Sequence, residues 1–450
     1  MKRFLIVLTA FLPLAGPVSA TRAAAGAELA QAPPAAGAPV IPPADLAALL
    51  REAEANSPAL RAVEARREAA RHLPSQAEAP PDPEVSVAYT NDGVSSFTLG
   101  ESDMSLLALT WTQEVPYPGK LRRSGEVASY ELERAGKDFE RARLEVAAAI
   151  KTAYAELYRL DRTGAILDET RTVLVSLAEV ARRRYEVGEG IQESVLKAQT
   201  EILRLEAEQV RVAQDRRTAE VRLNAVVGRS ADTPIGPAMA LPEAALPTEG
   251  DRLAEAAIAG SPEVGGLQAE VRREEAGVSL ARLDLKPDFV WSASYQNRDG
   301  LDPMVMGMFG LRLPLYRQRK QAQAVLQKES ELLAARKDLD DLQVRIQASV
   351  RELVSRARRA DRLLALFGQG VIPQADSTLE SAQSSYRVGR IGFLDVLNDL
   401  TALLNARTEL AIQESERLQA LAALEPLLGR ELVHVPGGPG GEGGNHAVNR

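Results

Sequence analysis

Long stretches of the chain repeat apolar residues in alternating steps of three and four, with charged residues between them. One such stretch runs from Gly119 to Val187 without a proline. Its apolar stripe consists of Leu132, Ala135, Phe139, Ala142, Val146, Ala149 and Ala153. A mean spacing of 3.5 residues is typical of helices that pack as coiled coils. The pattern predicts one helix of roughly 100 Å, at about 1.5 Å per residue.

A second helix is predicted from about Ile191 to Val227. Its stripe consists of Val195, Ala198, Ile202, Leu205, Val212, Ala219 and Leu223. The same two patterns return in the C-terminal half, where Gly368, Gly370 and Pro373 should kink or interrupt the longer helix. Because helices this long cannot bury themselves with so few large side chains, we expect the chain to form an oligomer.

Four shorter segments alternate apolar and polar residues with the period of two that β-strands show. Their apolar positions are Val85, Val87, Tyr89, Leu107, Leu109, Trp111, Phe289, Trp291, Tyr295, Val305, Phe309, Leu311 and Leu313. The segments are close to the length of a membrane-spanning strand, and the alternation fits a transmembrane β-barrel. It fits a half-buried soluble sheet equally well.

Four strands are too few to close a barrel. An open sheet edge is costly in lipid, where each unpaired backbone group costs several kcal/mol. If the strands span a membrane, several chains must therefore share one barrel. A homotrimer would supply about twelve strands, an even number within the known range.

The two halves of the chain carry the same local motifs, and we interpret the chain as a tandem duplication. Tyr185-Glu-Val-Gly188 recurs as Tyr386-Arg-Val-Gly389. Each motif is followed by Val-Leu seven residues after its glycine, and later by a Gly-Arg pair. All seven identities share an offset of 201 residues. A period this long makes each copy a whole domain-sized unit rather than a solenoid repeat.

The duplication sets the domain boundaries. We assign the first repeat to residues 44–229 and the second to 250–430, joined by a proline-rich linker over 230–249. Each repeat should begin with one helix, over 44–73 and about 250–285. Two strands and two long helices should follow in each.

The two ends of the chain differ in composition from the repeats. Residues 1–20 have a basic start, a short apolar run and small residues at the end, as a signal peptide for export does. Residues 21–43 are rich in alanine and proline, and residues 431–450 form a glycine-rich tail. Residues 21–43 are expected to be disordered or extended, and the tail is expected to be disordered.

Composition excludes several classes of function. The net charge of −8 disfavours a nucleic-acid partner, because no basic stripe is present to neutralise phosphates. The chain has no cysteine, which rules out disulfides and thiolate metal sites. Its three histidines, His72, His434 and His446, are scattered, and no phosphate loop or nucleophile motif is found. We therefore expect no catalytic set, no cofactor and no resident metal.

From about Leu46 to Arg430 the chain resembles the TolC-type outer-membrane efflux channels. The resemblance rests on the duplicated plan, the two Tyr-x-Val-Gly turns and the two Gly-Arg pairs. It implies a mainly α fold with β-structure, in which a homotrimeric 12-stranded β-barrel in outer-membrane lipid continues into an α-helical barrel in the periplasm. It also implies two partners, a periplasmic adaptor protein and an inner-membrane pump of the resistance–nodulation–division class.

A narrower resemblance suggests the exported solute. Val115-Pro-Tyr-Pro-Gly-Lys-Leu121 looks like the Pro-x-Pro-Gly-Lys stretch of the heavy-metal efflux branch, which serves cobalt–zinc–cadmium or copper–silver pumps. The same residues also fit a purely structural role, ending a strand and opening a helix. Export of organic solutes, and a soluble periplasmic coiled-coil adaptor or scaffold without a pore, remain the alternatives.

The resemblance places a gate at the periplasmic tip of the helices. The candidate tip residues are Tyr185, Gly188, Glu193, Ser194, Tyr386, Gly389, Arg390, Asp395 and Asn398. In the family, polar links between an acidic residue and an arginine close the tip. In this chain the position of the acidic residue is occupied by Ser194 and that of the arginine by Ile391. Tyr386, Arg390 and Glu193 could rebuild such a link. Asp395 matches a ring of aspartates that would attract cations, or it is simply a helix N-terminal charge.

Overall fold

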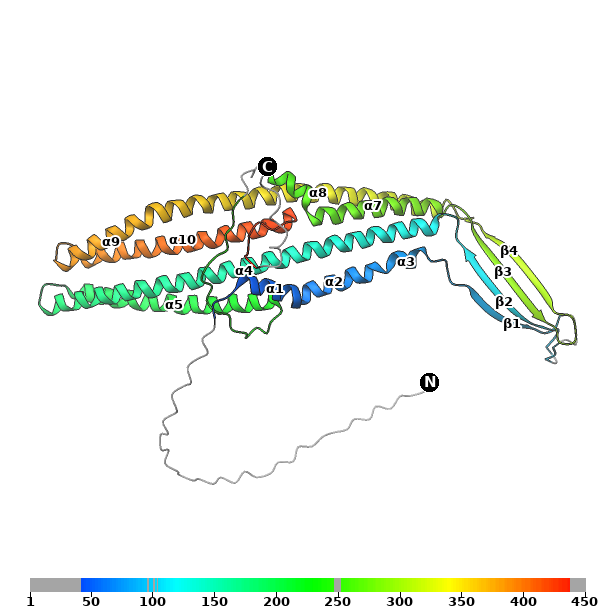
Figure 1. Cartoon of the computed structure of the whole chain (residues 1–450), viewed down its shortest axis with the longest axis horizontal. Helices are drawn as coiled ribbons and strands as arrows, with labels where there is room; N and C mark the ends of the chain where they lie inside the picture. Colours follow the sequence, from blue (N-terminus) through cyan, green and yellow to red (C-terminus); the bar gives the residue numbers. More distant parts are fainter. Residues whose placement is uncertain (1–41, 95–96, 100–101, 103, 247–251, 438–450) are drawn as a thin grey trace, which may run out of the picture. The chain divides into compact units, whose positions relative to one another are not determined.

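The computed structural model describes residues 42–94, 97–99, 102, 104–246 and 252–437. The predicted signal peptide lies outside this part, as do nearly all of 21–43 and residues 438–450 of the tail. The elements in chain order are α1 Leu46–Asn56, α2 Pro58–Arg71, α3 Leu73–Glu78, β1 Glu84–Thr90, β2 Leu106–Val115, α4 Lys120–Glu186, α5 Gln192–Val227, α6 Leu253–Gly260, α7 Pro262–Leu283, β3 Asp288–Asn297, β4 Met304–Arg312, α8 Gln321–Leu366, the π-helix Phe367–Val371, α9 Ile372–Arg387 and α10 Phe393–Leu428 (Figure 1).

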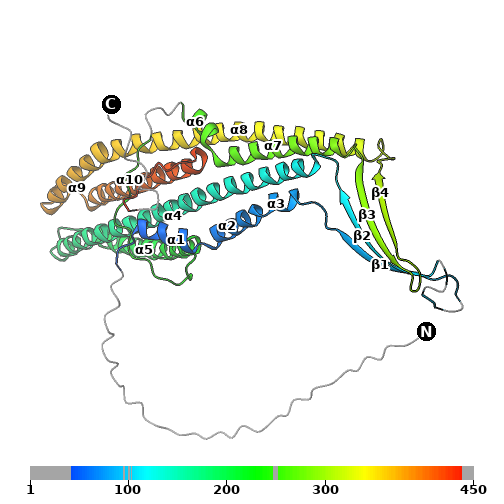
Figure 2. The ribbon, with the colours of Figure 1, turned by 45° about the vertical axis from the view of Figure 1, so that its right-hand side comes forward.

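The strands form one antiparallel sheet in the order β1-β2-β3-β4 (Figure 2). Their register puts apolar residues in line across all four strands. Val87 lies opposite Leu109, which lies opposite Tyr295, which in turn lies opposite Val305. The predicted alternation within the strands is therefore confirmed, and all the apolar positions predicted within them share one face.

In the two central strands, β2 and β3, the burial is the reverse of that in a soluble protein. On the apolar face, Trp291 and Phe309 are about half exposed, although they pack on each other with ring centroids 4.8 Å apart. On the other face, Ser294 and Gln296 are buried. The hydroxyl of Thr110 donates a 3.0 Å hydrogen bond to the Ser294 hydroxyl on this polar face. A half-buried soluble sheet would cover its apolar face instead.

Three helices, α1 to α3, precede the strands of the first repeat and two, α6 and α7, precede those of the second, so the prediction of one helix over 44–73 and another over about 250–285 is wrong. The chain breaks at Ser57, between α1 and α2, and at Ser261, between α6 and α7. Both serines are extended, with ψ of 118° and 124°. The cause is the proline that follows each serine, because proline disfavours the helical conformation in the residue before it.

The long helices agree closely with the sequence pattern. Helix α4 has 67 residues and α5 begins at Gln192, one residue after its predicted start. In the second repeat the π-helix joins α8 to α9 at the predicted interruption. A π-turn accommodates one additional residue in a helix. Asp161 and Asp361, before this turn, are 200 residues apart, whereas Tyr185 and Tyr386, after it, are 201 apart.

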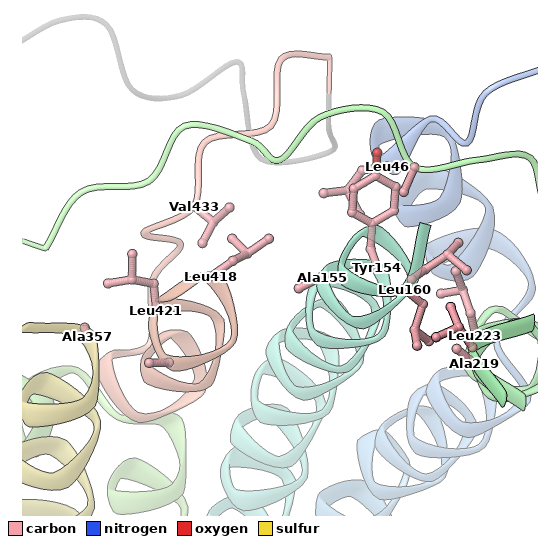
Figure 3. Packing of buried hydrophobic residues seen from close by; sticks show 14 of the residues in the cluster. Leu46, Tyr154, Ala155, Leu160, Ala219, Leu223, Ala357, Leu418, Leu421 and Val433 are labelled. Carbon is pink, nitrogen blue, oxygen red and sulfur yellow. The ribbon is translucent and has the colours of Figure 1, made fainter. Parts of the chain in front are cut away.

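The hydrophobic core lies where α4 packs against α1, α5 and α10, and where α8 packs against α10 (Figure 3). The α5 stripe is confirmed, with Ala198, Leu205 and Leu223 buried. None of the seven predicted stripe positions of α4 is buried, and Ala149 is exposed. The reason is that α4 packs on several sides, so its buried residues, such as Ile150 and Leu157, do not follow a single line.

A buried ion pair joins the two repeats. The Lys151 ammonium on α4 lies 2.8 and 2.7 Å from the two carboxylate oxygens of Glu425 on α10, and both side chains are almost fully buried. Glu425 also accepts hydrogen bonds from the backbone N–H groups of Leu432 and Val433. Val433 is buried and forms a β-bridge with Ala244 of the linker. The start of the predicted disordered tail at 431 is therefore wrong, because these residues pack on the core.

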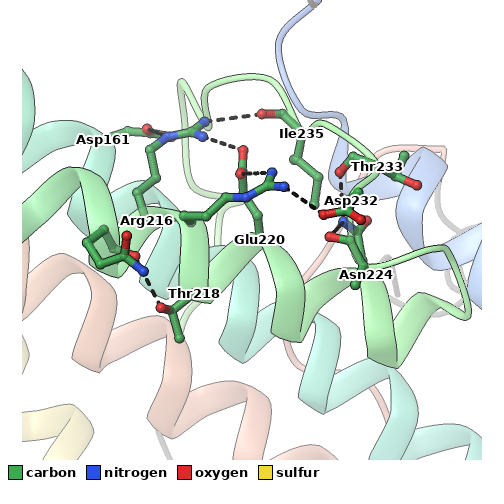
Figure 4. A network of polar contacts seen from close by, with 11 residues as sticks. Asp161, Arg216, Thr218, Glu220, Asn224, Asp232, Thr233 and Ile235 are labelled. Atoms are coloured by element: carbon green, nitrogen blue, oxygen red, sulfur yellow. Dashed lines mark hydrogen bonds and ion pairs between the residues drawn. The ribbon is translucent and has the colours of Figure 1, made fainter. Parts of the chain in front are cut away.

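Equivalent arginines tie the linker to each repeat. The Arg216 guanidinium on α5 binds Asp161 at 2.5 Å and the Ile235 carbonyl at 3.2 Å (Figure 4). Arg417 on α10 binds Asp361 at 2.5 Å and the Ala244 carbonyl at 2.6 Å. The same bond pattern at corresponding positions supports the duplication, and it makes the linker a packed segment.

No helix in the described part of the chain is both long and apolar enough to cross a membrane.

Candidate functional site

The two helical turns at the ends of α4 and α9 have the same geometry. Gly188 and Gly389 have φ of 79° and 78°, in the left-handed region where glycine is favoured. In each turn the glycine N–H donates a 3.0 Å hydrogen bond to the carbonyl of the motif tyrosine, Tyr185 or Tyr386. The repeated Tyr-x-Val-Gly motif thus encodes one turn, used twice.

The two tyrosines nevertheless have different surroundings. Tyr386 is 4% exposed, whereas Tyr185 is 46% exposed. The Tyr386 ring packs edge-on against Phe393, with centroids 6.0 Å apart. Burial raises the pKa of the Tyr386 hydroxyl, although the nearby Arg184 opposes the shift. Tyr386 is therefore a neutral, packed side chain at the junction of the two repeats.

Arg184 connects the two turns, and the sequence interpretation missed it. From the last turn of α4, its Nη1 donates a 2.9 Å hydrogen bond to the Tyr386 carbonyl. Its guanidinium lies 5.3 Å from the centroid of the Tyr386 ring, within the range of a cation–π contact. The corresponding residue of the second repeat is Ser385, so the duplication did not mark this position. The available signal was its place directly before the motif tyrosine.

The predicted polar link among Tyr386, Arg390 and Glu193 is not formed within one protomer. Glu193 pairs with Lys197 at 2.8 Å, and this hydrogen bond lowers the pKa of the Glu193 carboxyl. Arg390 is exposed and lies outside the groove between the turns. That groove, of about 350 Å³, brings together Glu193, Ser194, Tyr386 and Asp395, with Arg184 beside them.

Asp395 lies at the start of α10, in the position of a helix-capping carboxylate. Its side chain accepts a 3.1 Å hydrogen bond from the Gly392 N–H. The carboxylate is exposed, as is Asn398 one turn further along. The local geometry is that of a charge favoured by the helix dipole, and it leaves the carboxylate free to face solvent.

The proline-rich stretch between β2 and α4 has a clear structural role. The Lys120 ammonium binds Asp288 at 2.8 Å and Asp284 at 3.1 Å, and the Tyr117 N–H donates a 2.7 Å bond to Asp288. These bonds fix the junction of sheet and helices. In the described ranges, no three His, Asp or Glu side chains gather closely enough to hold a metal ion.

Comparison with solved structures shows which proteins share this fold. The outer membrane protein VceC of Vibrio cholerae superposes with a TM-score of 0.74 at 22% identity, covering 86% of this chain and 96% of VceC. The CmeC outer membrane channel of Campylobacter jejuni superposes with a TM-score of 0.72 at 13% identity, covering 86% of each chain. At these identities the likeness establishes the fold, which is mostly helical with one sheet.

Comparison of sequences identifies the family. The chain is 25% identical over 291 residues to the outer membrane efflux protein BepC of Brucella suis biovar 1 (strain 1330). The aligned part is 62% of this chain and 62% of BepC, so the chain spans somewhat less than two thirds of that relative. The sequence profile named Outer membrane efflux protein matches residues 49–229 and 253–430, which are the two repeats. The chain therefore belongs to the outer membrane efflux protein family, the TolC-type family that its duplicated motifs predict.

Proposed function

We propose that the chain is the outer-membrane channel of a tripartite efflux system, a passive exit duct without catalysis of its own. The observation that carries this proposal is the sheet, whose apolar face is exposed while Ser294 and Gln296 on its polar face are buried. Lipid is the environment that favours such a face. A soluble adaptor or scaffold would not need an exposed apolar sheet face, so this face disfavours that alternative.

The working assembly is a homotrimer. Strands β1 and β4 are the edges of the sheet, and their outer backbone groups need partners in a bilayer. Joining β4 of one protomer to β1 of the next closes a barrel of twelve strands. The helices then form a periplasmic barrel, and the predicted α4 stripe, which is only partly buried within the protomer, offers its remaining surface to neighbouring chains.

The tip of the helical barrel is the gate. Arg184 holds the first-repeat turn against Tyr386 of the second, with a bond and a ring contact that must separate when the tips move apart. The exposed side chains of Arg390 and Glu193 supply further polar links where protomers meet. Three Asp395 carboxylates around the axis form a ring that attracts cations and repels anions.

The solutes are heavy-metal cations, delivered by a periplasmic adaptor and an inner-membrane pump of the resistance–nodulation–division class. The Pro-Tyr-Pro-Gly-Lys stretch and the acidic tip support this assignment. The second candidate is export of drugs or other organic solutes. It is favoured by the fact that Lys120 of that stretch makes structural ion pairs to Asp284 and Asp288, which any solute class would need.

Two measurements test the proposal. The purified chain should run as a heat-modifiable trimer from the outer-membrane fraction and should conduct ions in planar bilayers. A deletion strain should lose tolerance to zinc, cobalt, cadmium, copper or silver ions more than to dyes and detergents. A soluble periplasmic protein without conductance would contradict the channel. Sensitivity to drugs alone would favour the second candidate and leave the channel intact.

A further inference from the structure

Three of the six methionines of the chain lie in a row on one face of β4. Met304, Met306 and Met308 occupy alternate positions of the strand, so their side chains point the same way. They lie opposite Gln296, Ser294 and Ser292 of β3, which places them on the polar face of the sheet. The three side chains are 47%, 50% and 57% exposed.

This placement is not explained by packing. A methionine that contacts lipid would be expected on the other face, where Val305 and Phe309 of the same strand lie. The rest of the polar face in β2 and β3 consists mostly of small or hydrogen-bonding side chains, among them Thr110 and Ser294. The methionine row therefore exposes three thioethers to the space that the polar face borders.

The spacing allows the three sulfur atoms to converge. Residues two apart in a strand have Cα atoms about 7 Å apart. Methionine has three rotatable side-chain bonds, so neighbouring sulfurs can lean toward one another. Gly310, the next position on the same face of the strand, adds no side chain that would crowd the row. Two or three thioethers can then contact one ion.

Thioether sulfur is a soft ligand that selects Cu(I) and, by the same softness, Ag(I) over hard or borderline ions such as Mg²⁺ and Zn²⁺. Without a thiolate or carboxylate beside them, thioethers bind such an ion only weakly. Weak, repeated sites suit a duct, since ions must leave as readily as they enter.

We propose that Met304, Met306 and Met308 form a contact site for a soft monovalent cation, Cu(I) or Ag(I), on the inner wall of the barrel. The inference rests on the proposed channel, in which the polar face of the sheet borders the lumen. It narrows the solute class, since a divalent hard or borderline cation gains little from three thioethers.

The test uses the full-length trimer in detergent and silver nitrate in chloride-free buffer, with binding followed by calorimetry. The wild-type protein should bind Ag(I), and the M304L/M306L/M308L variant should lose that binding. The matched control is M104L/M239L, which removes two other exposed methionines outside the strands and should bind as wild type does. Leucine preserves size and apolar character, so the triple variant should fold.

Each outcome of the test is decisive. Equal Ag(I) binding by the wild-type and triple-variant trimers, or no binding by the wild type, would overturn the proposed site. Wild-type binding of Zn²⁺ as strong as that of Ag(I) would overturn its selectivity. Bilayer conductance of the same preparations separates this failure from failure of the channel. Trimers that conduct but do not bind Ag(I) contradict the thioether site alone, whereas preparations that do not conduct contradict the channel.

Discussion

Replacing Arg184 by alanine should make the channel open more readily. The side chain donates a 2.9 Å bond to the Tyr386 carbonyl and lies 5.3 Å from the centre of the Tyr386 ring. A hydrogen bond from a charged donor contributes about 1.5–3 kcal/mol, and an exposed cation–π contact about 0.5–1 kcal/mol. Because Arg184 is only half-buried, solvent reduces both contributions.

We therefore estimate a loss of about 2 kcal/mol per protomer, which shifts the closed–open equilibrium roughly thirtyfold toward the open state. Single-channel conductance in planar bilayers measures this shift as longer or larger openings. The trimer should stay intact, since Arg184 contacts only the tip.

Two variants control for charge and for the hydroxyl. Arg183→Ala removes a neighbouring exposed charge for which the described residues provide no ion pair, and it should leave conductance unchanged. Tyr386→Phe retains the carbonyl and the ring that Arg184 contacts, so it should also resemble wild type. An unchanged Arg184→Ala channel, or an equal increase in the Arg183→Ala channel, would show that Arg184 does not hold the tip closed.

Three further predictions address stability and ion selectivity. Lys151→Met should destabilise the protein by about 3–5 kcal/mol in denaturant unfolding, because it leaves the Glu425 charge buried without its partner; a loss below about 1 kcal/mol, the range of exposed pairs, would be inconsistent with the buried pair. Asp395→Asn should weaken channel block by multivalent cations while the amide oxygen still accepts the Gly392 N–H, and unchanged block would argue against an acidic ring. The Arg229 hydrogen bond lowers the pKa of Glu52 below its usual 4.5, so its stabilisation should be complete above about pH 4.5 and lost as pH falls through the lowered value. The pH dependence of unfolding should flatten in Glu52→Gln, and an unaltered profile would contradict this.

Features repeated along the sequence were predictable. The two glycine turns, the strand alternation and the limits of α5 each follow from residues close together in the chain, whose pattern reports directly on local conformation. The helix breaks at Ser57 and Ser261 were also encoded locally, in the Ser-Pro dipeptides, although the sequence analysis placed one helix across each of them.

Contacts between distant residues were not predictable from one sequence. Arg184 and Tyr386 are 202 residues apart, and Lys151 and Glu425 are 274 apart. The periodicity of one helix does not show which other helix packs against it. The buried Lys151 therefore cannot be distinguished in the sequence from the exposed charged residues of α4. The same lack of three-dimensional information explains why the stripe predicted for α4 is not the buried set, since burial along α4 depends on several neighbouring helices.

In the proposed channel, the apolar face of the sheet meets lipid in a barrel shared by three chains. Single-particle cryo-electron microscopy of the full-length protein in lipid nanodiscs tests it most directly. We expect a trimer whose barrel takes four strands from each chain, with Trp291 and Phe309 against lipid and Ser294 toward the lumen. A closed monomeric barrel, or a particle whose apolar sheet face is covered by protein outside the bilayer, would contradict it.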